Sequence, residues 1–305
     1  MFSYIIRRVA AAVMVIAIVI VVVFFVTHML GDPVQIVLPS NATQAEVEAV
    51  RQQLHLNEPL YAQFFRFMGG AIHGDFGNSF WQGRPAIGIV WERFPATVLL
   101  CVAAIAIIVP IGVGLGILGA LRPGSVMDRA VSVLSFLSVS VVDFWLALML
   151  ILVFAVELRW FPASGYGGIQ HLVLPAVTVA FLQVGTLAQV TRASVLEEMK
   201  STYIAAARAR GLPESRVILN HGLRNAMVPI VTIIGADFAL LLNGTVIAEV
   251  VFAWPGTGQL LIQAINQQDL PLIEACVFFA AVIVTITNLL VDISYRFLNP
   301  RIRLT

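Results

Sequence analysis

Long apolar runs separated by short polar segments dominate the chain. A membrane-spanning helix needs about 20 mostly apolar residues, and six stretches of the sequence meet this requirement. The fourth is the least apolar, because Gln183 and Gln189 lie inside it and Pro175 lies near its start. The pattern predicts an all-α, polytopic membrane protein with six transmembrane helices. The predicted spans are Val9–Leu30, Ala96–Leu121, Ala130–Val156, Leu172–Val190, Ala226–Ala248 and Leu272–Val291.

Two polar segments between the predicted spans are long enough to have structure of their own. Residues 31–95 predict a small helical cap outside the membrane, where Thr43 and Glu46 have the spacing of a capping box followed by an apolar helical stripe. The other segment, residues 191–225, lies between spans four and five. No internal repeat and no second domain are evident, so we expect one transmembrane domain over residues 1–305.

The composition agrees with a membrane protein. Of the 305 residues, 59% are hydrophobic and 11% are charged, and the mean hydropathy is +0.93. A soluble domain carries roughly 25% charged residues, so the excess apolar side chains must face lipid. A formal net charge of +1 gives no reason to expect nucleic acid as a partner. No cleavable signal peptide is expected, because the first apolar run is long enough to span.

The basic residues orient the predicted spans. If the amino terminus is cytoplasmic, 13 of the 18 lysine and arginine residues fall in inner segments, and six of these lie in residues 191–225. The positive-inside rule therefore predicts that both termini are cytoplasmic.

The inner segment has the pattern of a bent pair of helices. Tyr203–Arg210 is strongly helix-forming, Gly211 is placed to end that helix in a left-handed conformation, and Pro213 stands where a second helix begins. Three consecutive alanines allow close approach of another backbone, and the arginines suit carboxylates. The pattern favours a docking surface for a partner protein, and the alternative is a basic loop that fixes topology or meets anionic lipid.

The residues give no support for an enzyme or for an internal motor. A phosphate-binding P-loop ends in Gly-Lys-Ser/Thr, and the only lysine, Lys200, lacks the preceding glycine. The five histidines are scattered, so no metal site is expected. Cys101 and Cys276 lie in apolar runs and favour packing roles over a disulfide or metal ligation.

Carboxylates inside predicted spans are functional candidates, because a charge at the bilayer centre is costly. Glu249 and Glu274 lie near the outer ends of their spans, where contact with water explains them. Asp143 and Asp237 lie near mid-span. For these two we expect a place on the translocation pathway or on a subunit seam, and the alternative is a local hydrogen bond.

An outer turn joins spans five and six. Its residues Trp254, Pro255, Gly256 and Gly258 form a Trp-Pro-Gly-x-Gly pattern. The turn is expected either to contact another protein outside the membrane or to cap span five.

The inner segment also carries motifs of a known family. YIAAARARGL at residues 203–212 and HGLRNAMVP at residues 221–229 resemble the EAA loop of ABC importer permeases, in the version of the dipeptide, oligopeptide, glutathione and nickel family. The resemblance to the first, B-type, permease of that family extends over essentially the whole chain. It includes Arg7-Arg8, Gly31-Asp32-Pro33, Leu56–Tyr61, Gly74–Gly77, Arg93–Thr97, Leu174–Ala176, Phe252–Gly258 and Asn299–Arg303.

The resemblance implies the type I importer permease fold and a division of labour. This chain and a second homologous permease would form the pathway in the bacterial inner membrane. Two cytoplasmic ATPases would bind the ATP and Mg, and an extracytoplasmic binding protein would deliver a short peptide. Glutathione and nickel chelates are alternative cargoes, since the binding protein largely chooses the cargo. A self-contained secondary transporter or channel is the alternative from another class, but it would need a repeat and an ion-coupling site.

The resemblance also assigns roles. The inner bend would be the coupling helix that seats on an ATPase, with the residues Tyr203, Ala205, Ala206, Ala207, Arg208, Gly211, Leu212 and Glu214. Two positions depart from the family pattern. Ala205 replaces the glutamate that names the EAA motif, as is usual in this subfamily. Val142 stands where relatives often have proline, which predicts the loss of a kink in span three.

Overall fold

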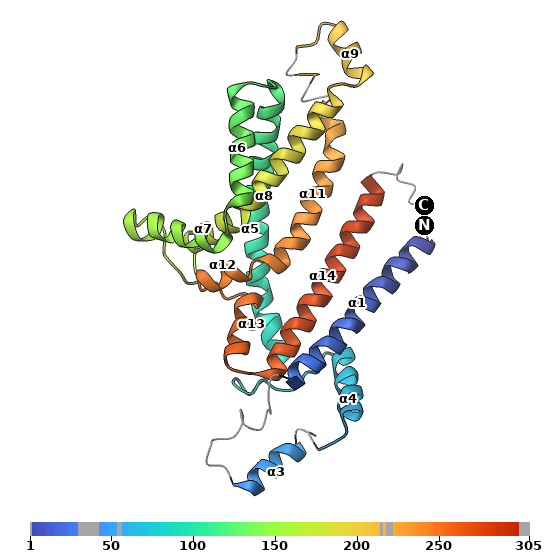
Figure 1. The fold of residues 1–305 in the computed structure, drawn as a ribbon, viewed down its shortest axis with the longest axis vertical. Helices are drawn as coiled ribbons and strands as arrows, with labels where there is room; N and C mark the ends of the chain where they lie inside the picture. Colours follow the sequence, from blue (N-terminus) through green and yellow to red (C-terminus); the bar gives the residue numbers. More distant parts are fainter. Residues whose placement is uncertain (1, 30–42, 54–56, 214–215, 218–221, 299–305) are drawn as a thin grey trace. The chain divides into compact units, whose positions relative to one another are not determined.

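The computed structural model describes residues 2–29, 43–53, 57–213, 216–217 and 222–298. Within these ranges the regular elements are helices (Figure 1), apart from one isolated bridge between Asn78 and Pro85. In chain order they are α1 (Phe2–Met29), α3 (Gln44–Gln53), α4 (Leu60–His73), α5 (Ala86–Leu121), α6 (Val126–Ser140), α7 (Asp143–Leu150), the π-helix η1 (Ile151–Glu157), α8 (Ile169–Glu198), α9 (Thr202–Ala209), α11 (Leu223–Gly244), α12 (Val246–Val251), α13 (Thr257–Asn266) and α14 (Leu270–Leu298).

In the part of the chain that the structure describes, five helices are long and apolar enough to cross a membrane. The spans are Ile6–Thr27, Ala86–Leu121, Ile169–Glu198, Asn225–Leu242 and Leu270–Ser294. They match five of the six predicted spans, and the bent pair α6 and α7–η1 occupies the position of the other. The prediction of an all-α, multi-span fold is confirmed.

The chain divides into two compact units. Unit 1 contains residues 1–96 and 255–289, and unit 2 contains residues 97–254 and 290–305. Unit 1 holds α1, α3, α4, α13, the start of α5 and most of α14. The core of unit 1 is formed by Ile20, Ala71, Phe76, Ala86, Ile89, Val90, Leu260, Ala264, Leu272, Ile273, Ala275, Cys276 and Phe279.

The capping box predicted for the outer segment is present. The Thr43 backbone N–H donates to Glu46 Oε2 at 2.7 Å, and the Glu46 N–H donates to Thr43 Oγ1 at 3.4 Å. The backbone hydrogen bond from Thr43 holds the pKa of Glu46 below its usual value. Reciprocal bonds of this kind satisfy two amide groups that a helix start leaves without intrahelical partners, so α3 begins where the sequence indicates.

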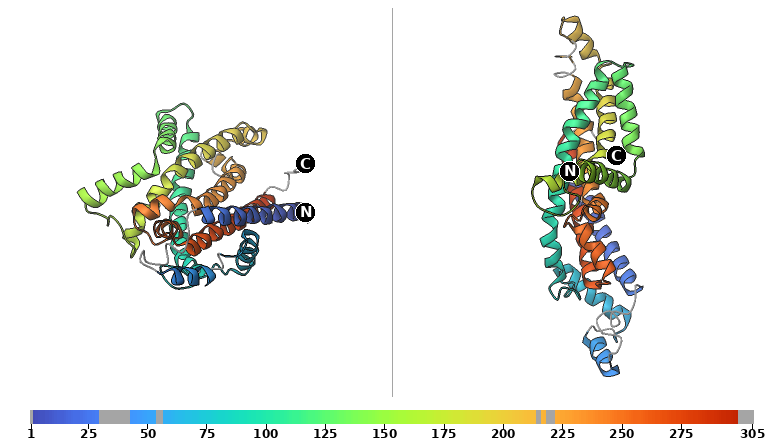
Figure 2. Two further views of the ribbon diagram at one scale, coloured as in Figure 1. Left: turned by 60° about the horizontal axis from the view of Figure 1, so that its bottom comes forward. Right: turned by 90° about the vertical axis from the view of Figure 1, so that its left-hand side faces the viewer.

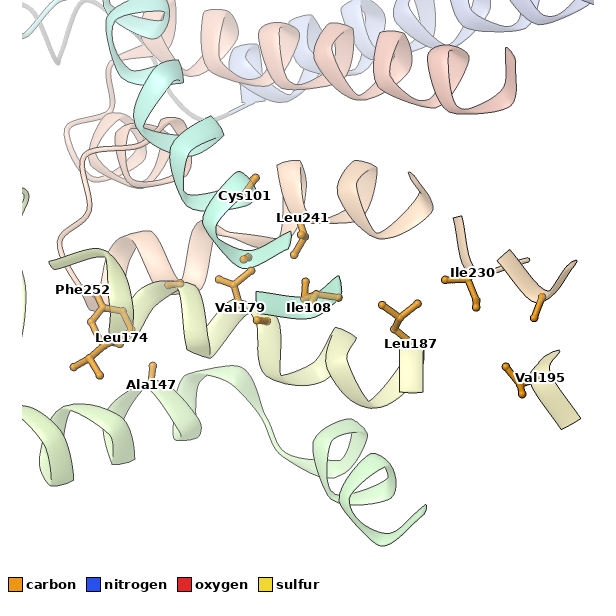
Figure 3. Packing of buried hydrophobic residues seen from close by; sticks show 14 of the residues in the cluster. Cys101, Ile108, Ala147, Leu174, Val179, Leu187, Val195, Ile230, Leu241 and Phe252 are labelled. Carbon is orange, nitrogen blue, oxygen red and sulfur yellow. The ribbon is translucent and has the colours of Figure 1, made fainter. Parts of the chain in front are cut away.

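Helix α8 is the centre of unit 2. It packs against α6, α7, α11 and α12, and half of its most apolar window is buried inside the protein. Figure 3 shows Val179 of α8 close to Ile108 of α5 and Leu241 of α11. A helix covered by other helices meets little lipid, which explains why this span is the least apolar of the five.

Two glycines bring the helices of unit 2 close together. A Cβ atom on Gly185 of α8 would lie 1.7 Å from Ser138 Oγ and 2.9 Å from the Ser135 carbonyl oxygen of α6. A Cβ atom on Gly116 of α5 would lie 2.4 Å from Thr191 Cβ of α8. Small residues at helix crossings are the usual means of close packing in membranes.

The prediction that Val142 removes the kink of span three is wrong. Helix α6 and the α7–η1 segment meet at 103°, and Val141 and Val142 between them are extended, with ψ of 130° at both. β-Branched residues favour extended backbone. In addition, Ser140 Oγ donates to the Phe136 carbonyl at 2.8 Å, a contact that often bends helices. The bend therefore needs no proline.

Candidate functional site

The segment after α8 folds into a bent structure with its own small core. We call residues 201–213 and 216–217 the elbow. Ile204 of α9 and Val217 are fully buried, and Ala207 is 9% exposed between them, with Met199 and Leu212 packed against this group. Figures 1 and 2 show α9 at one end of unit 2, beyond the ends of α8 and α11. The apolar contacts favour movement of the elbow as one body.

The bend lies at the predicted glycine. Gly211 has φ of +78°, in the left-handed region, and its N–H donates to the Arg208 carbonyl at 2.9 Å. A turn then starts at Pro213, whose carbonyl accepts from the N–H groups of Arg216 and Val217. These observations confirm the predicted helix end and the new start at Pro213, whereas Glu214 lies outside the described residues.

The predicted coupling residues divide between two sides of the elbow. Ala205, Ala206 and Arg208 are exposed, and so is Tyr203, at 39%. Ala207 and Leu212 face the elbow core. The outer side of α9 thus carries small side chains, and its inner side packs on the elbow core. This arrangement lets another protein approach the α9 backbone closely.

A hydrogen-bonded bridge joins the elbow to two long helices. The Tyr203 hydroxyl donates to Glu198 Oε2 at 2.5 Å, and Asn225 Nδ2 donates to the same hydroxyl at 2.8 Å. Glu198 is the last residue of α8, and Asn225 lies in the first turn of α11. Tyr203 therefore connects α9 to the helices on both sides of it. The motif indicated Tyr203, but its partners depend on the tertiary structure.

An ion pair between α6 and α8 was missed in the sequence. Arg192 Nε and Nη2 donate to the two carboxylate oxygens of Asp128, the second at 2.9 Å. The Gly124 N–H donates to Asp128 Oδ2 at 2.8 Å, and Ser125 Oγ accepts from the Asp128 N–H. Arg192 lies less than two turns before Glu198, so the pair braces α8 just ahead of the elbow. The Ser125–Asp128 spacing was the available signal, since it fits an N-terminal cap.

The two mid-span aspartates lie in different surroundings. Asp237 of α11 is 5% exposed, and its Oδ2 atom has no hydrogen-bond partner among the described residues. On α8, which packs against α11, Gln183 Oε1 is likewise buried, and no described residue forms a hydrogen bond with it. Asp143 is half-buried in the first turn of α7, directly after the bend and beside exposed Phe144. A carboxylate there suits the positive end of the helix dipole.

The interpretation of Glu249 as a water-facing residue is wrong. Glu249 is fully buried in unit 2, where Thr97 Oγ1 and Thr245 Oγ1 donate to its Oε1 at 2.8 and 3.0 Å. Glu274, in unit 1, is half-buried and accepts a hydrogen bond from Thr27 Oγ1 at 2.8 Å. Hydroxyl donors on other helices, which hydropathy does not reveal, accommodate both carboxylates.

The outer turn is more buried than a contact surface would be. Trp254 is buried in unit 2, where its ring centroid lies 4.9 Å from that of Tyr166 and its backbone N–H donates to the Glu249 carbonyl at 2.8 Å. In unit 1, Gly256 and Gly258 are buried and Pro255 is half-buried. This placement favours the alternative of a turn that caps span five.

Two family models cover most of the chain. The model of the binding-protein-dependent transport system inner membrane component matches residues 112–304, and the model of the N-terminal part of such membrane components matches residues 1–101. The chain belongs to this family. It is therefore a transport permease rather than an ATPase, and with several apolar helices it is a multi-pass membrane protein.

Relatives match the permease over nearly its whole length. It is 38% identical over 304 residues to the glutathione transport system permease protein GsiC of Escherichia coli K12, which covers 99% of both chains. It is also 38% identical over 312 residues, 99% of both chains, to a Brucella abortus protein provisionally named a peptide transport system permease protein.

A solved structure shares the fold of the permease. The permease resembles a chain of the MetNI methionine ABC transporter in an inward-facing conformation, with a TM-score of 0.51 and 20% identity. The match covers 69% of the permease and 94% of that chain. At this identity the likeness bears on the fold alone.

Proposed function

We propose that the permease is one half of the translocation pathway of an ATP-driven importer of short peptides. It would pair with a second homologous permease and two cytoplasmic ATPases that hold the ATP and Mg, and would receive substrate from an extracytoplasmic binding protein. The observation that carries this proposal is the elbow, which presents Ala205 and Ala206 on a packed body tied to α8 and α11. The names of the relatives support the cargo.

The cargo proposal is a small peptide. One relative is named for peptides and another for glutathione, itself a tripeptide, at the same identity of 38%. Nickel chelates are the other alternative cargo that the family resemblance implies. No group of three or more His, Cys, Asp or Glu side chains that suits a metal ion occurs in the described part of the chain.

In this proposal the elbow is the coupling helix and lies in the cytoplasm of a bacterial cell. The concentration of basic residues in the inner segments supports cytoplasmic termini and insertion in the inner membrane. Closure of the ATPases would displace the elbow, and the bridge through Tyr203 would pass the displacement to α8 and α11. The Asp128–Arg192 pair would extend it to α6. Gly211 and the exposed Arg208 would also contact the ATPase.

The mid-span aspartates receive separate roles. Asp143 would lie on the seam with the sister permease, because exposed apolar side chains surround it at the start of α7. Asp237 would face water on the pathway side of α11, because a buried carboxylate oxygen without a partner is costly unless water or another group reaches it. Of the four turn residues predicted to contact a binding protein, Pro255 is the one that is half-buried rather than buried, so the contact would be made there.

Reconstitution tests the proposal. The tagged permease, co-expressed with its genomic neighbours, should co-purify with a second permease and an ATPase. In proteoliposomes the complex should take up labelled di- and tripeptides only when ATP and the binding protein are supplied. Uptake driven by a proton or sodium gradient, catalysed by this chain alone, would refute the proposal.

A further inference from the structure

Helix α4 carries apolar side chains on two faces and polar side chains on a third. Successive residues of a helix are turned by about 100°, and on this spacing most positions of α4 fall into three sectors. We name them the packed face, the exposed apolar face and the polar face. The packed face consists of Phe64, Phe67 and Ala71. The exposed apolar face consists of Tyr61, Phe65 and Ile72. The polar face consists of Gln63, Arg66 and His73.

The packed face holds α4 against the transmembrane helix α1. Phe24 of α1 is 2% exposed. Its ring centroid lies 5.2 Å from that of Phe64 and 5.8 Å from that of Phe67. Ala71, one turn further along, is buried in the core of unit 1. The end of α1 therefore has α4 beside it.

The exposed apolar face has no cover within the described residues. Tyr61, Phe65 and Ile72 are 68%, 66% and 72% exposed. Single apolar residues on a surface are ordinary, but three large ones aligned on one helix face mark an interaction site. The polar face of the same helix makes α4 amphipathic.

Ring contacts connect this face to the end of α1, whose own exposed side chains are apolar. Phe25 of α1 is 54% exposed and contacts Phe24 at 5.6 Å. Phe24 contacts Phe64 at 5.2 Å, and Phe64 contacts Phe65 at 5.8 Å. A run of ring contacts through buried Phe24 thus connects exposed Phe25 of a membrane-spanning helix to exposed Phe65 of α4, so the exposed apolar face lies near the apolar surface of α1.

We propose that α4 lies in the membrane interface and inserts its exposed apolar face among the lipids where α1 leaves the bilayer. Amphipathic helices with aromatic and aliphatic residues on one side and charges on the other bind in this way. The polar face fits water and headgroups: Arg66 Nη2 donates to both carboxylate oxygens of Glu58, at 2.7 and 3.0 Å, and His73 is exposed. This role is independent of the proposed coupling to ATPases and of the cargo.

Single-cysteine spin labels in the assembled transporter, held in lipid nanodiscs, test the proposal. The native cysteines, Cys101 and Cys276, are first replaced by alanine. Phe65→Cys is then compared with Arg66→Cys, and Ile72→Cys with His73→Cys. Each pair differs by one residue along the helix and by about 100° around it. Power saturation with oxygen, which concentrates in lipid, and with a water-soluble nickel chelate reports the medium around each label.

The ratio of oxygen to nickel accessibility should be severalfold higher in Phe65→Cys and Ile72→Cys than in their neighbours. Equal nickel accessibility in both members of a pair would overturn the proposal in favour of a helix in water. Labels at residues 65 and 72 that neither reagent reaches would overturn it in favour of a protein partner. If the variants fail to assemble, a photoactivated carbene probe dissolved in the lipid should label Tyr61, Phe65 or Ile72 of the unaltered complex, and absence of labelling there would be contrary.

Discussion

Removal of the Tyr203 hydroxyl should weaken coupling and leave the fold intact. Tyr203→Phe keeps the ring and deletes the bonds to Glu198 and Asn225. A hydrogen bond contributes about 0.5–1.5 kcal/mol net, and water competes at this exposed position, so the two bonds together supply about 1–2 kcal/mol. A free energy of about 1–2 kcal/mol corresponds to a factor of about 5–30 in an equilibrium.

The assay compares peptide uptake with ATP hydrolysis in proteoliposomes that contain the complete transporter. Peptide taken up per ATP hydrolysed should fall by up to about 30-fold, while subunit recovery and basal hydrolysis stay at the level of the unaltered complex. Tyr166→Phe is the matched control, because the Tyr166 ring packs on Trp254 and its hydroxyl has no hydrogen bond within the described residues.

A double-mutant cycle identifies the bridge as the cause. If Tyr203→Phe and Asn225→Ala interrupt the same bridge, their combined effect on coupling should be smaller than the sum of the separate effects. Full additivity, or unchanged uptake per ATP in Tyr203→Phe, would refute the reasoning.

Three further substitutions have expected outcomes. Gly211→Ala should destabilise the elbow by about 1–2 kcal/mol, because left-handed backbone is strained for alanine. Strain is the whole cost, since no described atom lies within 4 Å of the added Cβ. The measurement is co-purification of the ATPase, which should be reduced in Gly211→Ala and unchanged in the control Gly114→Ala. Arg192→Gln should lower the melting temperature more than the double variant with Asp128→Asn, since only the single variant strands a buried carboxylate; an equal loss in both would contradict this. Gly185→Val should disrupt the α6–α8 crossing and reduce the folded yield, as gel filtration will show, because Ser138 Oγ occupies the place of the new Cβ; a normal elution profile would argue against the crossing.

Local signals in the sequence predicted much of the fold. Apolar length located five spans, the Thr43–Glu46 spacing located the start of α3, and Gly211 located the end of α9. In each of these cases the residues that determine the structure are close in sequence, so the local sequence pattern is enough to predict it.

Features that depend on distant partners were not predictable in this way. The buried state of Glu249 depends on Thr97, which lies 152 residues earlier. The pair between Arg192 and Asp128 joins residues 64 apart. Counting charges or measuring hydropathy assigns such residues to water or to topology, because neither method sees the facing helix.

The bend in span three shows the limit of an argument from one residue type. Absence of proline at Val142 suggested a straight helix, yet the backbone turns by 103°. The serine hydroxyl bonds in the last turn of α6 and the extended preference of two valines act together there. Several weak conformational preferences at one place thus bend the span as a single helix-breaking proline would.

Site-specific photo-cross-linking tests the central claim that a separate nucleotide-hydrolysing subunit acts on the elbow. Benzoylphenylalanine is introduced in place of exposed Ala206 in the assembled transporter, with Ala207, which faces the elbow core, as the matched position. The account predicts a cross-link from residue 206 to the ATPase, with a yield that changes when ATP is added, and little or none from residue 207. A complex that transports peptide normally but gives no ATPase cross-link from residue 206 in any nucleotide state would contradict it.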